Sequence, residues 1–360
     1  NIMITKAFLF DILSNFWLDS EPVSCEPHGC GHVNKTYLAI TETGHRYMLQ
    51  MIGPAFKDVH ALQDNITAVT DHLHKKTPEK HGALTLIPTT EGEDHYHDPD
   101  GHTWRIYEFI EDGICLECAE SPEDFYQAAI AFGTFQQQLN DFPADTLHET
   151  IPLFHNTPNR YKQLREVLER DPLGRAKEVE AEIAFAMARE EKAGQLVAML
   201  EAGELPLRVT HNDTKLNNVM FRASDRTPLC VVDLDTTMPG LSAYDFGDAI
   251  RFGASTAAED EKDLSKVWMD LELFRLFTKG YLEACPGLTD KEKEVLPLAA
   301  FTMTLECGIR FLADYIDGDN YFSIHYTEQN LDRCHTQFKL VADMETKWNK
   351  METIVENRGM

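Results

Sequence analysis

The most informative motif in the chain is HNDTKLNN at residues 211–218, which is followed by the apolar run VVD at residues 231–233. An aspartate follows the histidine by two residues, an asparagine comes five residues later, and a second aspartate ends a predicted strand. Phosphoryl transfer requires one carboxylate that accepts a hydroxyl proton, and an amide oxygen and a carboxylate that hold Mg²⁺. The spacing predicts Asp213 as the catalytic base and Asn218 and Asp233 as magnesium ligands, although each residue alone would be typical of an ordinary turn.

Three residues near this loop have predicted supporting roles. Lys215 follows the base by two residues, and we expect it to neutralise charge on the transferred group; a solvent-facing lysine is the alternative. His211 and Asp245 are expected to hold the loop in place by hydrogen bonds rather than to react.

The first hundred residues have the pattern of strands with one helix. Alternating or apolar runs predict strands at residues 33–40, 46–52, 84–88 and 103–109. Apolar residues spaced three or four apart predict an amphipathic helix over residues 58–75. We therefore expect an α+β protein in which residues 1–110 form an antiparallel β-sheet lobe with one helix, and a cleft separates it from the remainder.

The remainder, residues 111–360, has mainly helical spacing and is predicted to form the larger lobe. Predicted helices span residues 122–140, 157–170, 176–200, 264–283, 290–315 and 327–356. Short strands are expected within residues 208–223 and 229–234, on both sides of the catalytic loop.

A glycine pair at Gly29 and Gly31 precedes the first predicted hairpin. Backbone N–H groups of such a hairpin can approach phosphate, although a plain turn is the alternative. The chain has neither a Gly-x-x-x-x-Gly-Lys-Ser/Thr motif nor the Rossmann glycine spacing. A Walker-type nucleotidase is therefore excluded, and the glycines do not indicate a Rossmann nucleotide-binding fold.

Charge and composition limit the kinds of molecule that the chain can bind and the compartment in which it is expected. Lys and Arg number 33 and Asp and Glu 60, which gives a net charge of −27 and opposes nucleic-acid binding. An ATP site in such a chain needs metal ions and local donors. Without an apolar run of about 18 residues, we expect no membrane span. The eight cysteines are too sparse for a secreted disulfide framework, so a cytoplasmic enzyme with reduced thiols is expected.

Two alternatives involve transition metals. The pairs Cys25/Cys30 and Cys115/Cys118 could hold a structural zinc ion, but their glycine-rich and apolar contexts favour free thiols. The turn that carries His95, His97 and His102 is predicted to be solvated, with metal binding as the less favoured interpretation.

The residues around the loop resemble those of the aminoglycoside phosphotransferase-like kinases, relatives of choline and homoserine kinases. Longer stretches at residues 208–218, 232–240, 245–256, 306–315 and 319–322 resemble members of that family that phosphorylate the anomeric hydroxyl of N-acetylglucosamine or N-acetylgalactosamine. The resemblance implies a two-lobed protein-kinase-like fold, Mg²⁺ and ATP. Another sugar, an amino alcohol or an aminoglycoside is the alternative acceptor, and a non-catalytic sensor is the least favoured interpretation.

The same resemblance implies further contacts. His32, Arg310 and Tyr321 fall where the family contacts the sugar, together with Asp213. The alternatives are an ion pair in a helical core for Arg310 and a packed aromatic ring for Tyr321. The backbone of the connector Glu108, Phe109 and Ile110 would bind adenine.

One position departs from the broad kinase pattern. Gln50 stands where many kinases carry a lysine that pairs with the α- and β-phosphates. Neutralisation of the phosphates is therefore expected to fall mostly to Mg²⁺, Lys215 and backbone donors.

Overall fold

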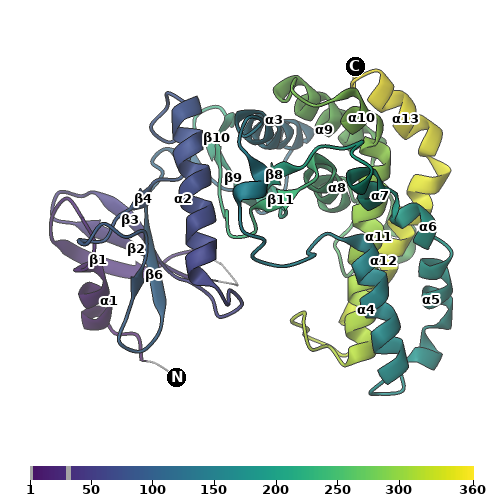
Figure 1. The fold of residues 1–360 in the computed structure, drawn as a ribbon, viewed down its shortest axis with the longest axis horizontal. Coiled ribbons are helices and arrows are strands. Elements are labelled where there is room, and N and C mark those ends of the chain that lie inside the picture. The colour runs from purple at the N-terminus through teal and green to yellow at the C-terminus, as the bar shows by residue number, and fades with distance from the viewer. Residues whose placement is uncertain (1–2, 30–33) are drawn as a thin grey trace.

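Alternating apolar side chains near the N-terminus form an antiparallel sheet in the computed structural model, which describes residues 3–29 and 34–360 (Figure 1). Its strands lie in the order β1-β2-β3-β6-β4, and β5 also pairs with β6. The strand bounds are β1 Pro22–Pro27, β2 Lys35–Thr41, β3 Arg46–Met51, β4 Leu86–Ile87, β5 Tyr96–His97 and β6 Thr103–Glu108. The predicted strands at residues 46–52 and 103–109 thus become neighbours.

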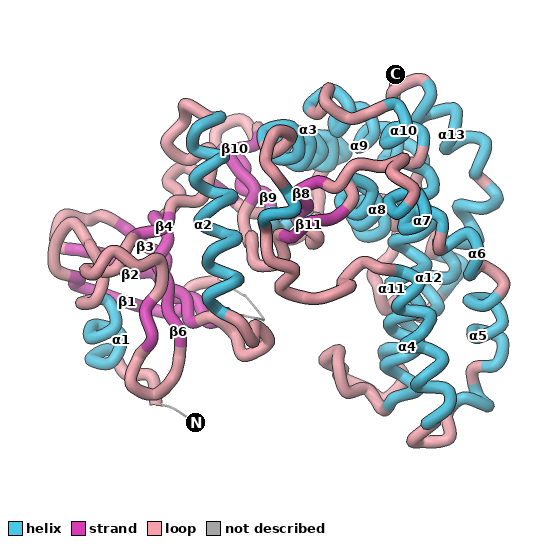
Figure 2. Tube along the Cα trace, in the orientation of Figure 1, coloured by secondary structure: helices cyan, strands magenta, loops and turns pink. Residues whose placement is uncertain are grey.

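Two helices accompany this sheet, α1 (Lys6–Leu13) and α2 (Val59–Lys76). The predicted apolar stripe of α2 is buried, and its N-cap Asp58 accepts a hydrogen bond from the backbone N–H of Ala61 at 3.0 Å. Figure 2 shows α2 between the strands and the helical remainder of the chain.

The remainder of the chain is mainly helical, and the predicted fold class is confirmed. Its helices are α3 Pro122–Gln138, α4 Thr157–Arg170, α5 Glu180–Met187, α6 Glu190–Ala193, α7 Gln195–Glu201, α8 Ser242–Gly253, α9 Leu271–Ala284, α10 Asp290–Glu294, α11 Leu296–Asp317, α12 Gln329–Thr346 and α13 Trp348–Glu356. Two small sheets lie beside them, β10-β9-β7 and β11-β8. Their strands are β7 Gly113–Ile114, β8 Arg208–Thr210, β9 Val219–Arg222, β10 Pro228–Val231 and β11 Met238–Gly240.

Four of the predicted long helices are interrupted in the structure. Residues 176–200 form a 3₁₀ turn and the separate helices α5, α6 and α7, and Gly194 lies at the junction of the last two. Residues 264–283 begin as a 3₁₀ turn, and Asp270 caps the helix that follows. Within residues 290–315 a new helix begins at Leu296, with Pro297 in its first turn, where the missing N–H of proline breaks no helical hydrogen bond. Residues 327–356 divide at Lys347.

Helix α11 is the centre of the helical part, where it packs against α4, α8 and α12. By length and composition it could cross a membrane, but 89% of its most apolar window is buried inside the structure. Its apolar surface is therefore used for packing against the other helices.

We expect Gly247→Ala to lower the free energy of unfolding by about 1–3 kcal/mol, because it overpacks the contact between α8 and α11. A Cβ atom at Gly247 would lie 2.3 Å from the backbone oxygen of Ala299. Urea denaturation measures the loss. Gly194→Ala is the control, since its nearest neighbour would be 3.6 Å away, and a similar loss in both variants would contradict the packing argument.

Candidate active site

One buried carboxylate fixes the backbone of the catalytic loop. Asp245, in the first turn of α8, accepts hydrogen bonds from the backbone N–H groups of His211 at 2.9 Å and Asn212 at 2.8 Å. Asn212 has a left-handed backbone (φ 70°), a conformation that asparagine adopts more readily than most residues. Burial raises the pKa of Asp245, against the opposing influence of His211 and the two N–H groups.

The His211 imidazole joins the loop to the next strand. Its Nδ1 accepts from the N–H of Asp213 at 3.2 Å, and its Nε2 lies 2.9 Å from the carbonyl oxygen of Val232. Both ring nitrogens therefore have backbone partners, with the proton on Nε2. The ring is fully buried, which suits the predicted anchoring role.

The same network brings the two predicted metal ligands to the loop. The side-chain nitrogen of Asn218 donates to the backbone carbonyl oxygen of Asp213 at 2.8 Å. The backbone carbonyl oxygen of Asn218 accepts from the N–H of Val232, also at 2.8 Å. Asp233 follows immediately, with a left-handed backbone (φ 57°) at the end of β10. Because the Asn218 side chain donates through its nitrogen, its Oδ1 is left for a cation.

The electrostatics of Asp233 fit a divalent cation. Asp233 is exposed, but neighbouring protein atoms displace part of the water around its carboxylate. This desolvation, together with the carboxylates of Asp235 and Asp213, raises the pKa of Asp233 to about 6. A cation between these groups would relieve the repulsion. Carboxylate and amide oxygens are also the hard donors that Mg²⁺ prefers, so the residues present fit the predicted ion.

A buried arginine lies beside Gln50, the residue that stands where many kinases carry a lysine. Arg105 of β6 lies opposite Gln50 in the sheet, and its Nε and Nη2 donate to the Gln50 side-chain oxygen at 2.9 and 2.8 Å. Its Nη1 and Nη2 also donate to both carboxylate oxygens of Asp235, at 2.6 and 2.9 Å. Burial alone would lower the pKa of Arg105, but the Asp235 carboxylate raises it overall.

This pair was missed by sequence reasoning, which assigned the neutralisation to Mg²⁺, Lys215 and backbone donors. The available signal was a charged residue within the apolar strand at residues 103–108. The structure adds the positive charge of Arg105, paired with the carboxylate of Asp235, which lies two residues after Asp233 in the chain. Lys215 is partly buried, and its Nζ lies 5.6 Å from the centre of the Phe252 ring.

The predicted acceptor-side residues lie on and beside α11. The half-buried Arg310 follows Glu306 by one helical turn, so both share a face. Glu306 is bonded to His155 Nδ1 at 2.8 Å, and His155 Nε2 lies 3.2 Å from the carbonyl oxygen of Asn212. This chain of contacts directs the face of α11 that carries Arg310 toward the catalytic loop.

Aromatic rings surround the Arg310 guanidinium. Its central carbon lies 5.3–5.6 Å from the centres of three rings, those of Phe154, Tyr321 and Phe322. Tyr321 is 70% exposed, which argues against an ordinary packed ring. The Arg160 guanidinium lies 5.8 Å from the Phe154 ring, and burial and the nearby charge of Arg310 lower its pKa. Two cations therefore flank one aromatic side chain.

The predicted nucleotide residues are described only in part. Gly29 ends the segment after β1 with φ 79°, whereas Gly31 and His32 lie outside the described residues. Glu108, at the end of β6, lies within 3.2 Å of His45 and Lys80. Phe109 packs beside Arg46, and its N–H donates to the Arg46 carbonyl at 3.3 Å. The buried Ile110 completes this link toward β7.

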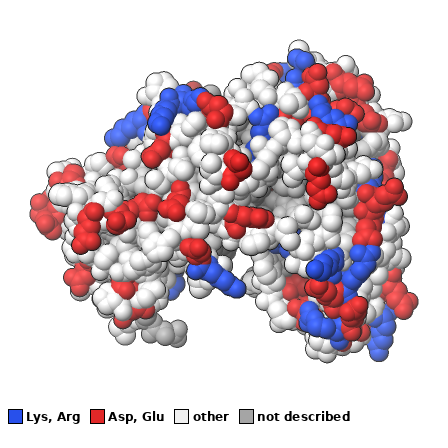
Figure 3. Space-filling view, viewed as in Figure 1, with Lys and Arg blue, Asp and Glu red and all other residues white. Residues whose placement is uncertain are grey.

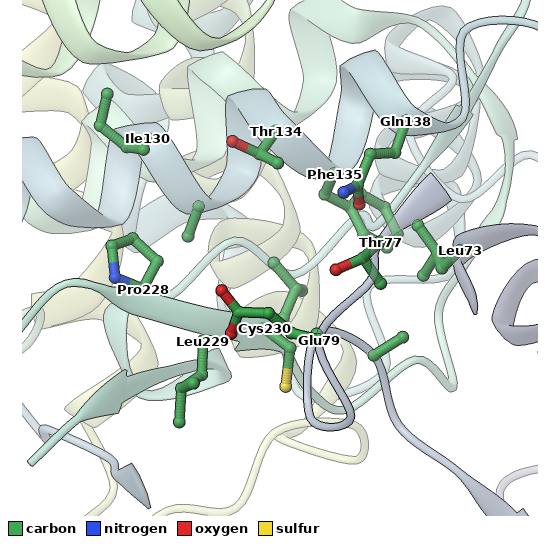
Figure 4. A pocket seen from close by; sticks show the side chains of 14 residues that line it. Leu73, Thr77, Glu79, Ile130, Thr134, Phe135, Gln138, Pro228, Leu229 and Cys230 are labelled. Carbon is green, nitrogen blue, oxygen red and sulfur yellow. The ribbon is translucent and has the colours of Figure 1, made fainter. Parts of the chain in front are cut away.

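Two cavities have none of the predicted catalytic groups in their walls. One, of about 190 Å³, is enclosed by the end of α2, by α3 and by β10, and Figure 4 shows Leu73, Phe135 and Cys230 on its walls. Another, of about 380 Å³, borders the catalytic loop at Leu216 and extends along Arg251 and Phe252. We place the chemistry at the hydrogen-bonded loop rather than in either cavity, because neither wall carries Asp213, Asn218 or Asp233.

Comparisons with known proteins agree with this arrangement. A sequence profile described as "Phosphotransferase enzyme family" matches residues 24–267. A microcompartment-associated aminopropanol kinase has a similar structure, with TM-score 0.65, 17% identity, and coverage of 96% of this chain and 98% of its own. An aminoglycoside phosphotransferase from Alicyclobacillus acidocaldarius gives TM-score 0.62, 13% identity, and coverage of 99% and 98%. A spectinomycin phosphotransferase bound to ADP and spectinomycin gives TM-score 0.62, 14% identity, and coverage of 96% and 99%. At these identities the similarity shows a shared fold.

We expect Asp245→Asn to lower the free energy of unfolding by about 1–3 kcal/mol, because one backbone N–H of the loop would then face an amide nitrogen. Denaturant unfolding monitored by circular dichroism measures the change. Asp263→Asn is the control, since Asp263 is a capping residue on an exposed turn. An Asp245→Asn variant as stable as the wild type would contradict the anchoring role.

Proposed function

Because the chain belongs to the phosphotransferase enzyme family, we propose that it transfers the γ-phosphoryl group of Mg²⁺-ATP to the anomeric hydroxyl of an N-acetylhexosamine. Phosphotransfer to a small molecule follows from the family. The observation that supports a neutral sugar as acceptor is the pair of guanidinium groups, Arg160 and Arg310, that lie beside aromatic rings.

Asp213 receives the sugar's proton in the proposed step. The 1-hydroxyl oxygen forms a bond to the γ-phosphorus, the bond between that phosphorus and the ADP oxygen breaks, and the hydroxyl proton passes to the Asp213 carboxylate. Little proton removal is needed early in a loose transition state, so Asp213 mainly orients the hydroxyl. The bond from Asp213 N–H to His211 holds its backbone for this task.

Asn218 and Asp233 are the proposed magnesium ligands. The ion would neutralise charge on the phosphate oxygens. Arg105 keeps the neighbouring Asp235 carboxylate paired, which limits the negative charge that the triphosphate meets. Lys215 is proposed to neutralise the charge that develops on the transferred phosphoryl group.

We propose that the nucleotide lies between residues 1–110 and residues 111–360, treated as two lobes. Gly29 and Gly31 would approach the phosphates, and the backbone at Glu108, Phe109 and Ile110 would bind adenine. Asp112 and Gly113 follow this connector directly, and Asp112 has a left-handed backbone (φ 62°). A bend there would separate the two lobes. We also propose a cytoplasmic location, because the described cysteines are free thiols.

The acceptor side suits a neutral, hydroxyl-rich ring. Arg310 can donate to sugar oxygens, and the exposed Tyr321 ring can cover an apolar face of a pyranose. His32 is proposed as a further sugar contact. A polycationic aminoglycoside would be repelled by Arg160 and Arg310, which makes that alternative less favourable than a sugar. Aminopropanol and spectinomycin are acceptors named for similar structures, so amino alcohols and aminoglycosides remain the competing classes.

Asp213→Asn is expected to lower kcat by about 10²–10⁴-fold, because the amide cannot accept the hydroxyl proton. A coupled assay of ADP release measures turnover, and the thermal shift caused by Mg²⁺-ATP checks that nucleotide binding persists. Asp225→Asn, in an exposed turn, is the matched control. The wild type in excess EDTA should also lose turnover and regain it with Mg²⁺. An Asp213→Asn enzyme with wild-type kcat would refute the assignment.

N-Acetylglucosamine and N-acetylgalactosamine are expected to give the highest kcat/KM in a panel that includes simple hexoses, ethanolamine, choline, homoserine and kanamycin. Phosphorus NMR should identify the product as the 1-phosphate. Arg310→Ala should raise KM for the sugar by about ten- to a hundredfold, since a charged hydrogen bond contributes about 1.5–3 kcal/mol. Arg170→Ala is the control, because that side chain is 59% exposed and pairs with Asp317 at the surface.

Two outcomes of this panel would change the assignment. Preference for ethanolamine or choline, with faster turnover in Arg310→Ala, would indicate an amino alcohol kinase. No turnover with any acceptor, together with intact nucleotide binding, would favour a sensor.

A further inference from the structure

Three histidines from two separate segments converge at one place beside the sheet. His60 lies in the first turn of α2, and His95 and His97 lie at the start of the β5–β6 hairpin. A ring nitrogen of each lies within 4.8 Å of those of the others. The three ring centres are 4.8, 4.9 and 5.3 Å apart. From this convergence we propose that His60, His95 and His97 bind a divalent transition-metal ion of the Zn²⁺ type.

Hydrogen bonds orient two of the three rings. His95 Nδ1 lies 2.5 Å from Asp94 Oδ1, and Thr67 donates to the other oxygen of that carboxylate at 2.5 Å. His97 Nδ1 lies 2.9 Å from the Thr103 hydroxyl oxygen. Both rings therefore have Nε2 available as a ligand atom. A carboxylate that fixes a histidine in this manner is the usual support for metal-binding imidazoles.

The donor set selects the class of ion. Imidazole nitrogens suit Zn²⁺, Cu²⁺ and Ni²⁺, whereas Mg²⁺ and Ca²⁺ prefer oxygen. Tetrahedral zinc with bonds of about 2.0–2.1 Å places ligand nitrogens about 3.3 Å apart. The rings therefore have to move closer by an ångström or more, and His60 and His97 are exposed side chains that can rotate. Three protein ligands leave the fourth position for water.

The charges around the cluster favour a cation. Partial desolvation and the neighbouring His95 and His60 lower the pKa of His97, which favours the neutral imidazole that binds metals. Two carboxylates, Asp94 and Asp98, adjoin the cluster and favour a bound cation. The cluster thus combines three imidazoles with the negative charge of nearby carboxylates, which favours a bound cation.

The structure changes the interpretation of the histidine-rich turn made from sequence. His95 is 9% exposed rather than solvated. His102, grouped with His95 and His97 by its position in the turn, instead lies 3.6 Å from Asp98. The third histidine, His60, lies in α2, 35 residues before His95 in the chain, and spacing in the sequence could not indicate it.

A bound ion would join α2 to the β5–β6 hairpin. The carbonyl oxygen of Asp94 already accepts from Gln63 of α2 at 3.1 Å, and the Gln63 side-chain oxygen accepts from Arg105 at 3.1 Å. The cluster is therefore connected through one glutamine to the buried Arg105–Asp235 pair. Binding should stabilise the folded protein by mass action, in addition to any effect on activity.

The test is a titration of the full, tag-free chain with Zn²⁺ by calorimetry in buffer without Mg²⁺. We expect one ion per chain and a rise in the melting temperature. His60→Ala and His97→Ala should weaken binding by at least about tenfold, and Asp94→Asn by about 10–100-fold. His102→Ala, in the same turn, should bind like the wild type. Tetrahedral Co²⁺ should give an absorption spectrum that His60→Ala lacks.

Two controls separate this site from other zinc-binding groups. Cys118→Ser removes an exposed thiol, and Asp233→Asn alters the proposed magnesium site; both should leave the titration unchanged. His60 and His97 are exposed, so their variants should fold, and circular dichroism checks this. Zinc binding that is absent in the wild type, or that persists equally in His60→Ala and His97→Ala, would overturn the proposal whatever the acceptor of the kinase proves to be.

Discussion

The rest of the site depends on the two hydrogen bonds that the Asp245 carboxylate accepts from the backbone of His211 and Asn212. They hold Asn212 in a left-handed conformation, which turns the chain so that the next residue, Asp213, leaves the buried network. Asp245 itself belongs to α8, which packs on α11. The position of the proposed base is therefore set by the packing of two helices, and the loop has little freedom of its own.

A chain with a net charge of −27 has to bind a polyanion, and the structure meets this difficulty locally. The Asp235 carboxylate is neutralised by Arg105, while Asp233 is left with a raised pKa and an open surface. Figure 3 shows acidic side chains spread over the surface of the sheet-bearing part. In the described residues around the site, positive charge is supplied by buried or half-buried side chains, those of Arg105, Lys215 and Arg310, rather than by a basic surface.

The sequence allowed the fold class to be predicted because local patterns determine it. The apolar stripe of α2 and the alternation in β3 and β6 are properties of neighbouring residues. Helix breaks at Gly194 and Lys347 were missed, since they depend on how the pieces pack against α11 and α9 rather than on composition. The loop from Asp213 to Asn218 is contiguous and could be recognised, and its roles stay predictions. The Arg105–Asp235 pair spans 130 residues and could be found only in three dimensions.

Helix α2 connects the proposed sites of the molecule. Its Asn65 donates to the carbonyl oxygens of His148 at 2.8 Å and Thr237 at 3.4 Å, so its middle is tied to one segment before the catalytic loop and one after it. Gln63, on the same helix, contacts both Asp94 and Arg105. A displacement of α2 would therefore alter the partners of Asp235 and, through them, the surroundings of Asp233. Since His60 lies about one turn before Gln63, an ion held there would act on a helix that contacts the Arg105–Asp235 pair and, through it, influences the charge balance at Asp233.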